Sequence, residues 1–99
     1  MHKTGFIALD LATELYLECE KLKLKNPVKD QLLRASLSIA LNITEGSGRS
    51  STKDKKRFYS IAMGSLRETQ TLVKIVNNQN LVERYHYLGA LVYGLVQKT

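Results

Sequence analysis

At 99 residues, the chain is the size of one domain, and its 43% apolar and 24% charged residues exclude an intrinsically disordered protein. Its uninterrupted apolar runs span a few residues, far short of the roughly 20 that a membrane-spanning helix needs, so we expect no membrane partner. Fifteen Lys and Arg against nine Asp and Glu leave a net charge of +6, which favours a polyanionic partner or an acidic protein surface.

Turn-forming residues predict two helices in the first half of the chain. Asn26 precedes the only proline, Pro27, so we expect Asn26 to cap a helix whose first turn holds the proline. Either Gly46 or Gly48 is expected to end that helix by adopting the left-handed conformation. These breaks predict helices over about residues 5–24 and 27–46.

Capping residues predict two more helices in the second half. Ser51 opens a capping box in which Asp54 takes the place of the usual glutamate, and Asn80 with Glu83 repeats the spacing. The predicted helices cover about residues 52–78 and 81–97. No window shows a sustained two-residue alternation, so no strand is expected. Short links between helices imply antiparallel neighbours, and we predict a single all-α domain over residues 1–99, an up-down antiparallel four-helix bundle.

Apolar residues at helical spacing predict one buried face on each of three helices. Cys19 falls on this face of the 5–24 helix, which makes it a small core residue and not a nucleophile. The predicted faces comprise Ala8, Leu11, Ala12, Leu15, Cys19 and Leu22; then Phe58, Ile61, Ala62, Ser65, Leu66, Thr69, Leu72, Val73 and Val76; and Leu81, Tyr85, Leu88, Leu91, Val92 and Leu95.

The 27–46 helix has apolar or small residues around most of its circumference. One run is expected to face the core: Leu32, Ala35, Ser36, Ile39 and Ile43. A second run lies on another side: Leu33, Leu37, Ala40, Leu41 and Thr44. A monomer would leave the three leucines of the second run in water, so we predict self-association, with a central position for this helix as the alternative. The polar stripe of the same helix, including Arg34, Asn42 and Glu45, is expected at the subunit boundary.

Positive charge is concentrated between residues 21 and 57, which hold ten bases and three acids. On the 52–78 helix, four cations share a sector opposite the apolar face, and no acid lies among them. Such a row suits contacts with phosphates, while the alternative is a solvated outer face. The predicted nucleic-acid-binding residues are Lys21, Lys23, Lys25, Arg49, Lys53, Lys55, Lys56, Arg67 and Lys74.

Acidic side chains form a separate stripe at Asp10, Glu14 and Glu18, spaced by four residues. We expect these carboxylates to be solvated. The alternative is that they meet a basic surface of a neighbouring subunit or partner.

No residue combination indicates catalysis. His2 and His86 have no second ligand at helical spacing, so we expect neither a metal site nor a cofactor. The segment Gly46-Ser47-Gly48 lacks the lysine of a nucleotide-binding loop. We therefore predict a protein that is not an enzyme. A single cysteine and the absence of an apolar leader favour the cytoplasm.

Two motifs resemble a known family. The segment Asn42-Ile43-Thr44-Glu45-Gly46 and the segment Gly64-Ser65-Leu66-Arg67-Glu68 lie within a match over residues 27–76. This pattern resembles the bacterial four-helix-bundle proteins encoded in intervening sequences of 23S ribosomal RNA genes. It is also similar to their relatives, the accessory variability determinants of diversity-generating retroelements.

The resemblance implies a ring-like homopentamer. In the retroelement branch it implies a positive ring that binds nucleic acid and a reverse transcriptase, and in the ribosomal branch it implies RNA binding. It also implies architectural roles for Arg34, Asn42, Glu45 and Glu68. With Arg57 as an ion-pair partner, the predicted subunit interface comprises Leu33, Arg34, Leu37, Leu41, Asn42, Glu45, Arg57 and Glu68.

We therefore predict a non-enzymatic, homo-oligomeric accessory protein that binds RNA or DNA through a basic outer surface. One alternative is a protein-interaction module that docks an acidic protein without nucleic acid. Another is a bundle that binds a small ligand, which requires inward polar groups without partners.

Overall fold

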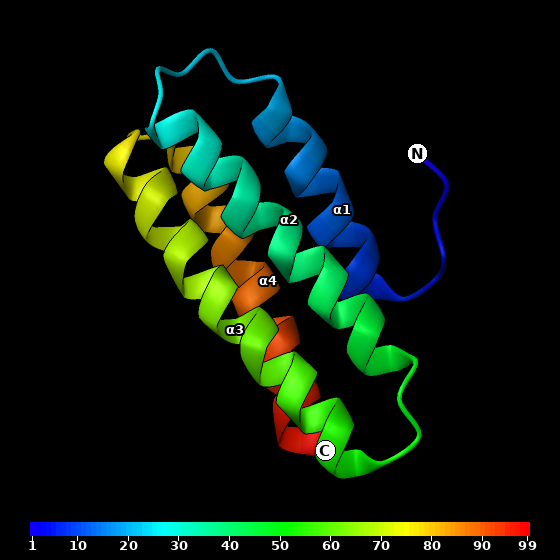
Figure 1. Ribbon diagram of the computed structural model, residues 1–99. Coiled ribbons are helices and arrows are strands. Elements are labelled where there is room, and N and C mark those ends of the chain that lie inside the picture. The colour runs from blue at the N-terminus through cyan, green and yellow to red at the C-terminus, as the bar shows by residue number, and fades with distance from the viewer.

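Four antiparallel helices form the bundle in the computed structural model, which describes residues 1–99 (Figure 1). They are α1 (Ile7–Glu20), α2 (Val28–Ser47), α3 (Thr52–Ile75) and α4 (Gln79–Lys98). Each helix packs against its neighbour in the chain, and α4 closes the bundle against α1. The molecule measures 41 × 25 × 20 Å. The predicted all-α, four-helix bundle is confirmed.

The first helix is shorter than predicted, because residues 21–25 leave the helix instead of continuing it. In this segment Lys21, Lys23 and Lys25 are exposed, whereas Leu22 and Leu24 are half-buried against the core. That alternation is typical of extended backbone with one face against the protein. This two-residue pattern over residues 21–25 overturns the expectation that no window of the chain shows such an alternation.

The residues at the two ends of α2 have different roles from those predicted. Pro27 is the residue before the helix, and the Asn26 Oδ1 accepts from the Asp30 N–H at 3.2 Å, one turn inside. Gly48 follows the helix with a φ of −88°, so the predicted left-handed glycine is wrong. Gly46 lies within α2 and is buried against Tyr59, where a Cβ would come within 2.6 Å of the tyrosine ring. Close packing, and not turn geometry, requires glycine at this position.

The capping prediction for α3 is confirmed, since the Ser51 side chain accepts from the Asp54 N–H at 3.1 Å. The helix ends at Ile75, three residues earlier than predicted, because Asn77 adopts a φ of 58°. The Asn78 N–H then bonds to the Val73 carbonyl and the Asn77 N–H to the Lys74 carbonyl, which is a Schellman ending.

The start of α4 lies two residues before its predicted position. Asn78 caps it by accepting from the Leu81 N–H at 3.0 Å. The predicted cap, Asn80, lies inside the helix, so Asn80 with Glu83 is not the capping pair.

The core follows the predicted helix faces closely. Cys19 is buried, as predicted, and so are all five inward residues of α2. Two positions on α3 are corrections: Ile61 is exposed, and Tyr59 takes the buried place. Every buried polar side-chain atom has a hydrogen-bond partner, which contradicts the small-ligand alternative, because that alternative needs unpartnered groups.

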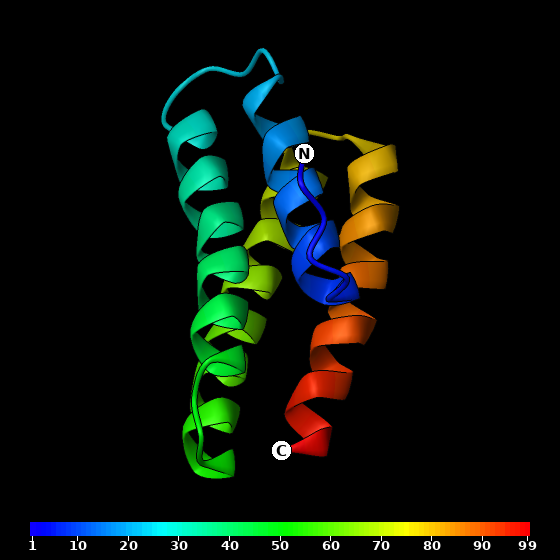
Figure 2. The same ribbon diagram turned by 90° about the vertical axis from the view of Figure 1, so that its right-hand side faces the viewer.

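The unequal helix lengths leave one end of the bundle with three helices. α1 has 14 residues, while the other helices have 20 to 24. α1 starts partway along the bundle, so the end of α4 extends past it toward the α2–α3 turn (Figure 2).

Candidate nucleic-acid interface

A row of cations lies along the outer side of α3. Lys53, Lys56, Arg67 and Lys74 are all exposed, as the sequence predicts. At 1.5 Å per residue the row extends over roughly 30 Å. The ion pairs of the chain join Arg49 to Glu45 and Arg84 to Glu14 and Glu18, so none of them involves this row. Its positive charges therefore remain available to a ligand.

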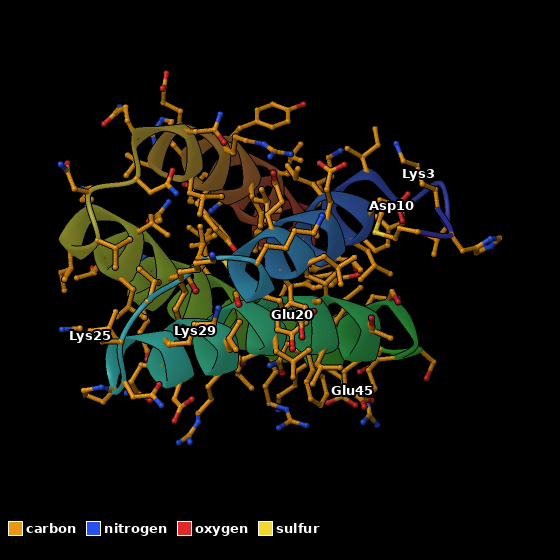
Figure 3. The ribbon with its side chains drawn as sticks, turned by 90° about the horizontal axis from the view of Figure 1, so that it is seen from above. Lys3, Asp10, Glu20, Lys25, Lys29 and Glu45 are labelled. Atoms are coloured by element: carbon orange, nitrogen blue, oxygen red, sulfur yellow. The ribbon has the colours of Figure 1, made fainter.

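A second group of cations lies on the segment between α1 and α2. Lys21, Lys23 and Lys25 are exposed there, and Figure 3 shows Lys25 on the outer edge of the segment. The predicted helix over residues 5–24 would place Lys21 and Lys23 in its last turn. They do not lie in the last turn of α1, because α1 ends at Glu20.

The remaining two predicted binding residues have partners within the chain. The Arg49 guanidinium pairs with the Glu45 carboxylate at 2.8 Å and lies 4.8 Å from the centre of the Phe58 ring. The Lys55 ammonium group is 3.4 Å from the Gly46 carbonyl and 3.3 Å from the Ser47 carbonyl, at the end of α2. Both cations stabilise the α2–α3 corner, which weakens their case as ligand contacts.

One lysine was not singled out by the sequence analysis. The Lys29 ammonium group donates to the carbonyls of Cys19, Glu20 and Leu22, so it caps the end of α1 from the first turn of α2 (Figure 3). Helix carbonyls that lack an internal partner favour a cation at this end. A prediction that α1 ends at Glu20 would have allowed this role of Lys29 to be recognised from the sequence.

The acidic stripe of α1 is partly exposed but has partners within the chain, which corrects the prediction that its carboxylates are only solvated. Arg84 of α4 pairs with both Glu14 and Glu18. Asp10 accepts from the Thr4 N–H at 2.9 Å, the Thr4 hydroxyl at 2.8 Å and the Gly5 N–H at 3.0 Å. The Thr4 N–H bond is the main cause that lowers the pKa of Asp10. All three carboxylates therefore hold parts of the chain together.

The predicted subunit interface lies mainly on the outer side of α2. Leu37 is 39% exposed and Leu41 is 58% exposed, as expected for a single chain. Leu33 is a correction, because it packs against the core and is only half-exposed.

The polar residues of that predicted interface are satisfied in different ways. The Asn42 side chain donates to the Ser38 carbonyl at 2.9 Å, and the Ser38 hydroxyl meets the Ser65 hydroxyl at 2.7 Å. Glu45 pairs with Arg49, as described above. Arg57 lies 4.5 Å from the centre of the Phe58 ring, and Arg34 and Glu68 are exposed. The predicted subunit interface therefore contains exposed charged side chains and exposed leucines, together with polar groups that already have partners within one chain.

The buried polar groups do not form a reactive site. The Cys19 thiol lies 3.4 Å from the Tyr85 hydroxyl, and both residues are fully buried. Burial raises the pKa of the Cys19 thiol and that of the Tyr85 phenol, which keeps both groups neutral. The structure holds no group of three His, Cys, Asp or Glu side chains that could bind a metal ion. No helix has the combination of length and hydrophobicity that crossing a bilayer requires.

A family model matches most of the chain. The family model described as 23S rRNA-intervening sequence protein matches residues 6–91, which includes most of all four helices. No curated protein matches the chain.

Proposed function

Because the chain belongs to the 23S rRNA-intervening sequence protein family, we propose that it is a non-enzymatic RNA-binding accessory protein. It acts as a homo-oligomer and contacts RNA through a basic outer surface. The centre of that surface is the α3 row, defined as Lys53, Lys56, Arg67 and Lys74, and the segment with Lys21, Lys23 and Lys25 extends it.

The observation that carries this proposal is the absence of any ion pair along the α3 row. Elsewhere in the chain, Arg49 and Arg84 each pair with a carboxylate. Four exposed cations without acidic partners cost free energy through mutual repulsion, and phosphates of a nucleic acid relieve it. Each neutralised phosphate also releases a condensed counterion, which favours binding at low salt.

Self-association is supported by the apolar residues on the outer side of α2. Leu37 and Leu41 have no covering element in the single chain, and polar or charged residues flank them. Burial of such leucines against a second copy contributes favourable free energy at about 25 cal/mol per Å² of apolar surface. A ring of copies, a pentamer by the resemblance described above, would repeat the α3 row around its circumference.

The finer assignment to a retroelement and its reverse transcriptase stays a prediction. The genomic neighbourhood distinguishes the two branches. A nearby reverse transcriptase gene with variable repeats supports the retroelement branch, and a position within a ribosomal RNA gene supports the other.

Charge reversal of the α3 row tests the function. The variant with Lys53, Lys56, Arg67 and Lys74 all changed to Glu is expected to lose RNA binding in a gel-shift series at increasing salt. Wild-type affinity should fall steeply with salt, by a log–log slope of about −0.9 per neutralised duplex phosphate. Unchanged binding by the variant overturns the assigned surface. If the wild type binds no RNA but captures an acidic protein from nuclease-treated lysate, the protein-docking alternative is correct.

A second experiment tests the oligomer. Leu37→Asp combined with Leu41→Asp places two charges in the proposed contact, so light scattering should show a fall to single chains. Thr71→Asp combined with Ser60→Asp is the matched control, because both residues are exposed on α3. A wild-type protein that is monomeric at micromolar concentration contradicts the oligomer.

A further inference from the structure

A shallow groove runs along the junction of α3 and α4, beside the α3 row. It has a volume of about 320 Å³ and continues into a smaller hollow of about 90 Å³. Arg67 lines the groove, Lys74 lines the hollow, and Gln70 and His86 line both. None of the lining residues carries a carboxylate. The α3 row therefore borders a concave surface and not a flat one.

α3 and α4 approach each other closely next to Arg67. Gly89 is buried there, and a Cβ at this position would come within 3.0 Å of the Gln70 Nε2 and 3.2 Å of the Leu66 side chain. Ala90, the next residue, also lines the groove. The Gln70 Nε2 donates to the Tyr85 carbonyl at 3.3 Å, which fixes its side chain across the junction. The Gln70 and Leu66 side chains therefore fill the space above Gly89, and α3 and α4 pack closely beneath the groove.

α4 also carries an exposed aromatic ring on this side. Tyr93 follows His86 by seven residues, which is about two helical turns, so both residues lie on the same side of α4. Tyr93 is 55% exposed, and its hydroxyl makes no hydrogen bond within the chain. His86 lies level with Gln70, and α3 and α4 are antiparallel, so the rise of roughly 10 Å from His86 to Tyr93 runs past Met63, toward Lys56 on α3. Tyr93 therefore lies beyond the lining residues of the groove, on the stretch between Arg67 and Lys56. Cations on one helix thus run beside ring systems on the other.

The opposite side of α4 offers a contrast. Tyr87 is 57% exposed, almost the same as Tyr93. It lines a different groove, of about 320 Å³, whose charged lining residues are Asp10, Glu14 and a single cation, Lys3. Carboxylates at this position repel phosphates, so an equally exposed tyrosine there is not placed to meet a nucleic acid.

From this arrangement we propose that the α3–α4 groove binds single-stranded RNA. The phosphates lie along the α3 row, and unpaired bases stack on the rings of Tyr93 and His86. A single strand is favoured over a duplex because stacking on a side chain needs an exposed base face, which a duplex hides. This inference rests on the proposed RNA-binding function and specifies the form of RNA that the site takes.

The experiment compares two tyrosines of equal exposure. Tyr93→Ala and Tyr87→Ala are titrated with a single-stranded RNA oligonucleotide and with a duplex of the same sequence. Tyr93→Ala should weaken single-strand binding roughly 5- to 100-fold, the usual range for the loss of one base-stacking ring. The slope of affinity against salt should not change, since no charge is removed. Tyr87→Ala should change neither affinity by more than about twofold.

Two further variants separate stacking from folding. Tyr93→Phe keeps the ring and should bind as the wild type does. His86→Ala should weaken single-strand binding in the same direction as Tyr93→Ala. Circular dichroism should show the same helix content in every variant, because both tyrosines are exposed.

The outcomes distinguish this inference from the function on which it rests. If the wild type binds RNA through the α3 row but Tyr93→Ala behaves like Tyr87→Ala, the stacking groove is wrong and the proposed function stands. Preference of the wild type for the duplex overturns the inference in the same way. If the wild type binds no RNA of either form, both the function and the groove are overturned.

Discussion

Arg84 and Arg67 lie at opposite sides of α4 and have opposite surroundings. Arg84 reaches from α4 to α1, where it pairs with Glu14 and Glu18. Arg67, on α3, lines a groove without a carboxylate and makes no ion pair. One arginine joins two helices of the bundle, and the other remains free for a ligand.

The same division applies to the lysines. Lys29 and Lys55 each donate to carbonyls at the end of a helix, so their charge serves the fold. Lys53, Lys56 and Lys74 make no such contact. The net charge of +6 therefore overstates the positive charge that a partner meets near Lys29 and Lys55. Near Lys53, Lys56 and Lys74 the positive charge is fully available to a partner. The position of each cation relative to carboxylates and helix ends decides which case applies.

The largest expected effect comes from reversing charges on one side at a time. Lys56→Glu with Arg67→Glu removes two free cations, and Lys3→Glu with Lys98→Glu removes two on the α1–α4 side. Both double variants change the net charge by the same amount. We expect the first to weaken RNA binding roughly 10- to 100-fold and the second to weaken it about twofold. Fluorescence anisotropy with labelled RNA at fixed salt measures the difference.

Equal losses in the two double variants would show that net charge alone controls binding. The distinction between the two sides of α4 would then have no functional meaning.

A pair of single substitutions separates stability from binding. Arg84→Ala leaves Glu14 and Glu18 without a partner, and these part-exposed ion pairs are screened by water, so we expect a loss of about 1 kcal/mol. For a chain of this size, that corresponds to a fall in melting temperature of about 4–8 °C. Arg67→Ala should leave the melting temperature unchanged and weaken RNA binding. Thermal unfolding followed by circular dichroism measures stability, and RNA titration measures binding. The interpretation requires the loss of stability in Arg84→Ala and the loss of binding in Arg67→Ala.

The fold was predictable from the sequence because helix periodicity and capping act locally. Ser51 caps α3 as predicted, and the inward residues of α2 are all buried. The failures are at helix ends, where several local structures compete. Asn77 adopts a left-handed conformation at the end of α3. The sequence predicted that conformation for a glycine at the end of α2 instead. Gly46 is needed because of Tyr59, and a contact between two helices has no local signal.

The candidate site was predictable only in part. The α3 row could be recognised because its members repeat at helical spacing on one side. The pair between Glu45 and Arg49 was missed although its i,i+4 spacing is a local signal. The partner of Glu14 could not be recognised, because it depends on which helices become neighbours. The groove with His86 was missed for the same reason, since its lining residues come from two helices.

Two adjacent lysines give a smaller and sharper test. Lys55→Gln removes a donor to the Gly46 and Ser47 carbonyls and should lower stability by about 0.5 kcal/mol, with little change in RNA affinity. Lys56→Gln should leave stability unchanged and reduce the slope of affinity against salt by about one. Chemical unfolding and salt-dependent titration measure the two effects. A change in slope for both lysines would place Lys55 on the binding surface despite its helix-end contacts.

The smallest expected effect concerns Asp10 and the pH dependence of stability. Its pKa is lowered from the ordinary value of 3.8, chiefly by the Thr4 N–H, so the folded state favours the charged carboxylate. The stabilisation is therefore present above pH 3.8 and is lost as the pH falls toward the lower pKa of the folded state. Asp10→Asn has no such titration, so its melting temperature should fall less steeply than that of the wild type between about pH 5 and pH 2. Other carboxylates titrate in both proteins, which makes the difference between the two curves the relevant quantity. Identical slopes would mean that the Thr4 and Gly5 contacts do not hold the charged carboxylate in solution, and the N-terminal segment would then be free of α1.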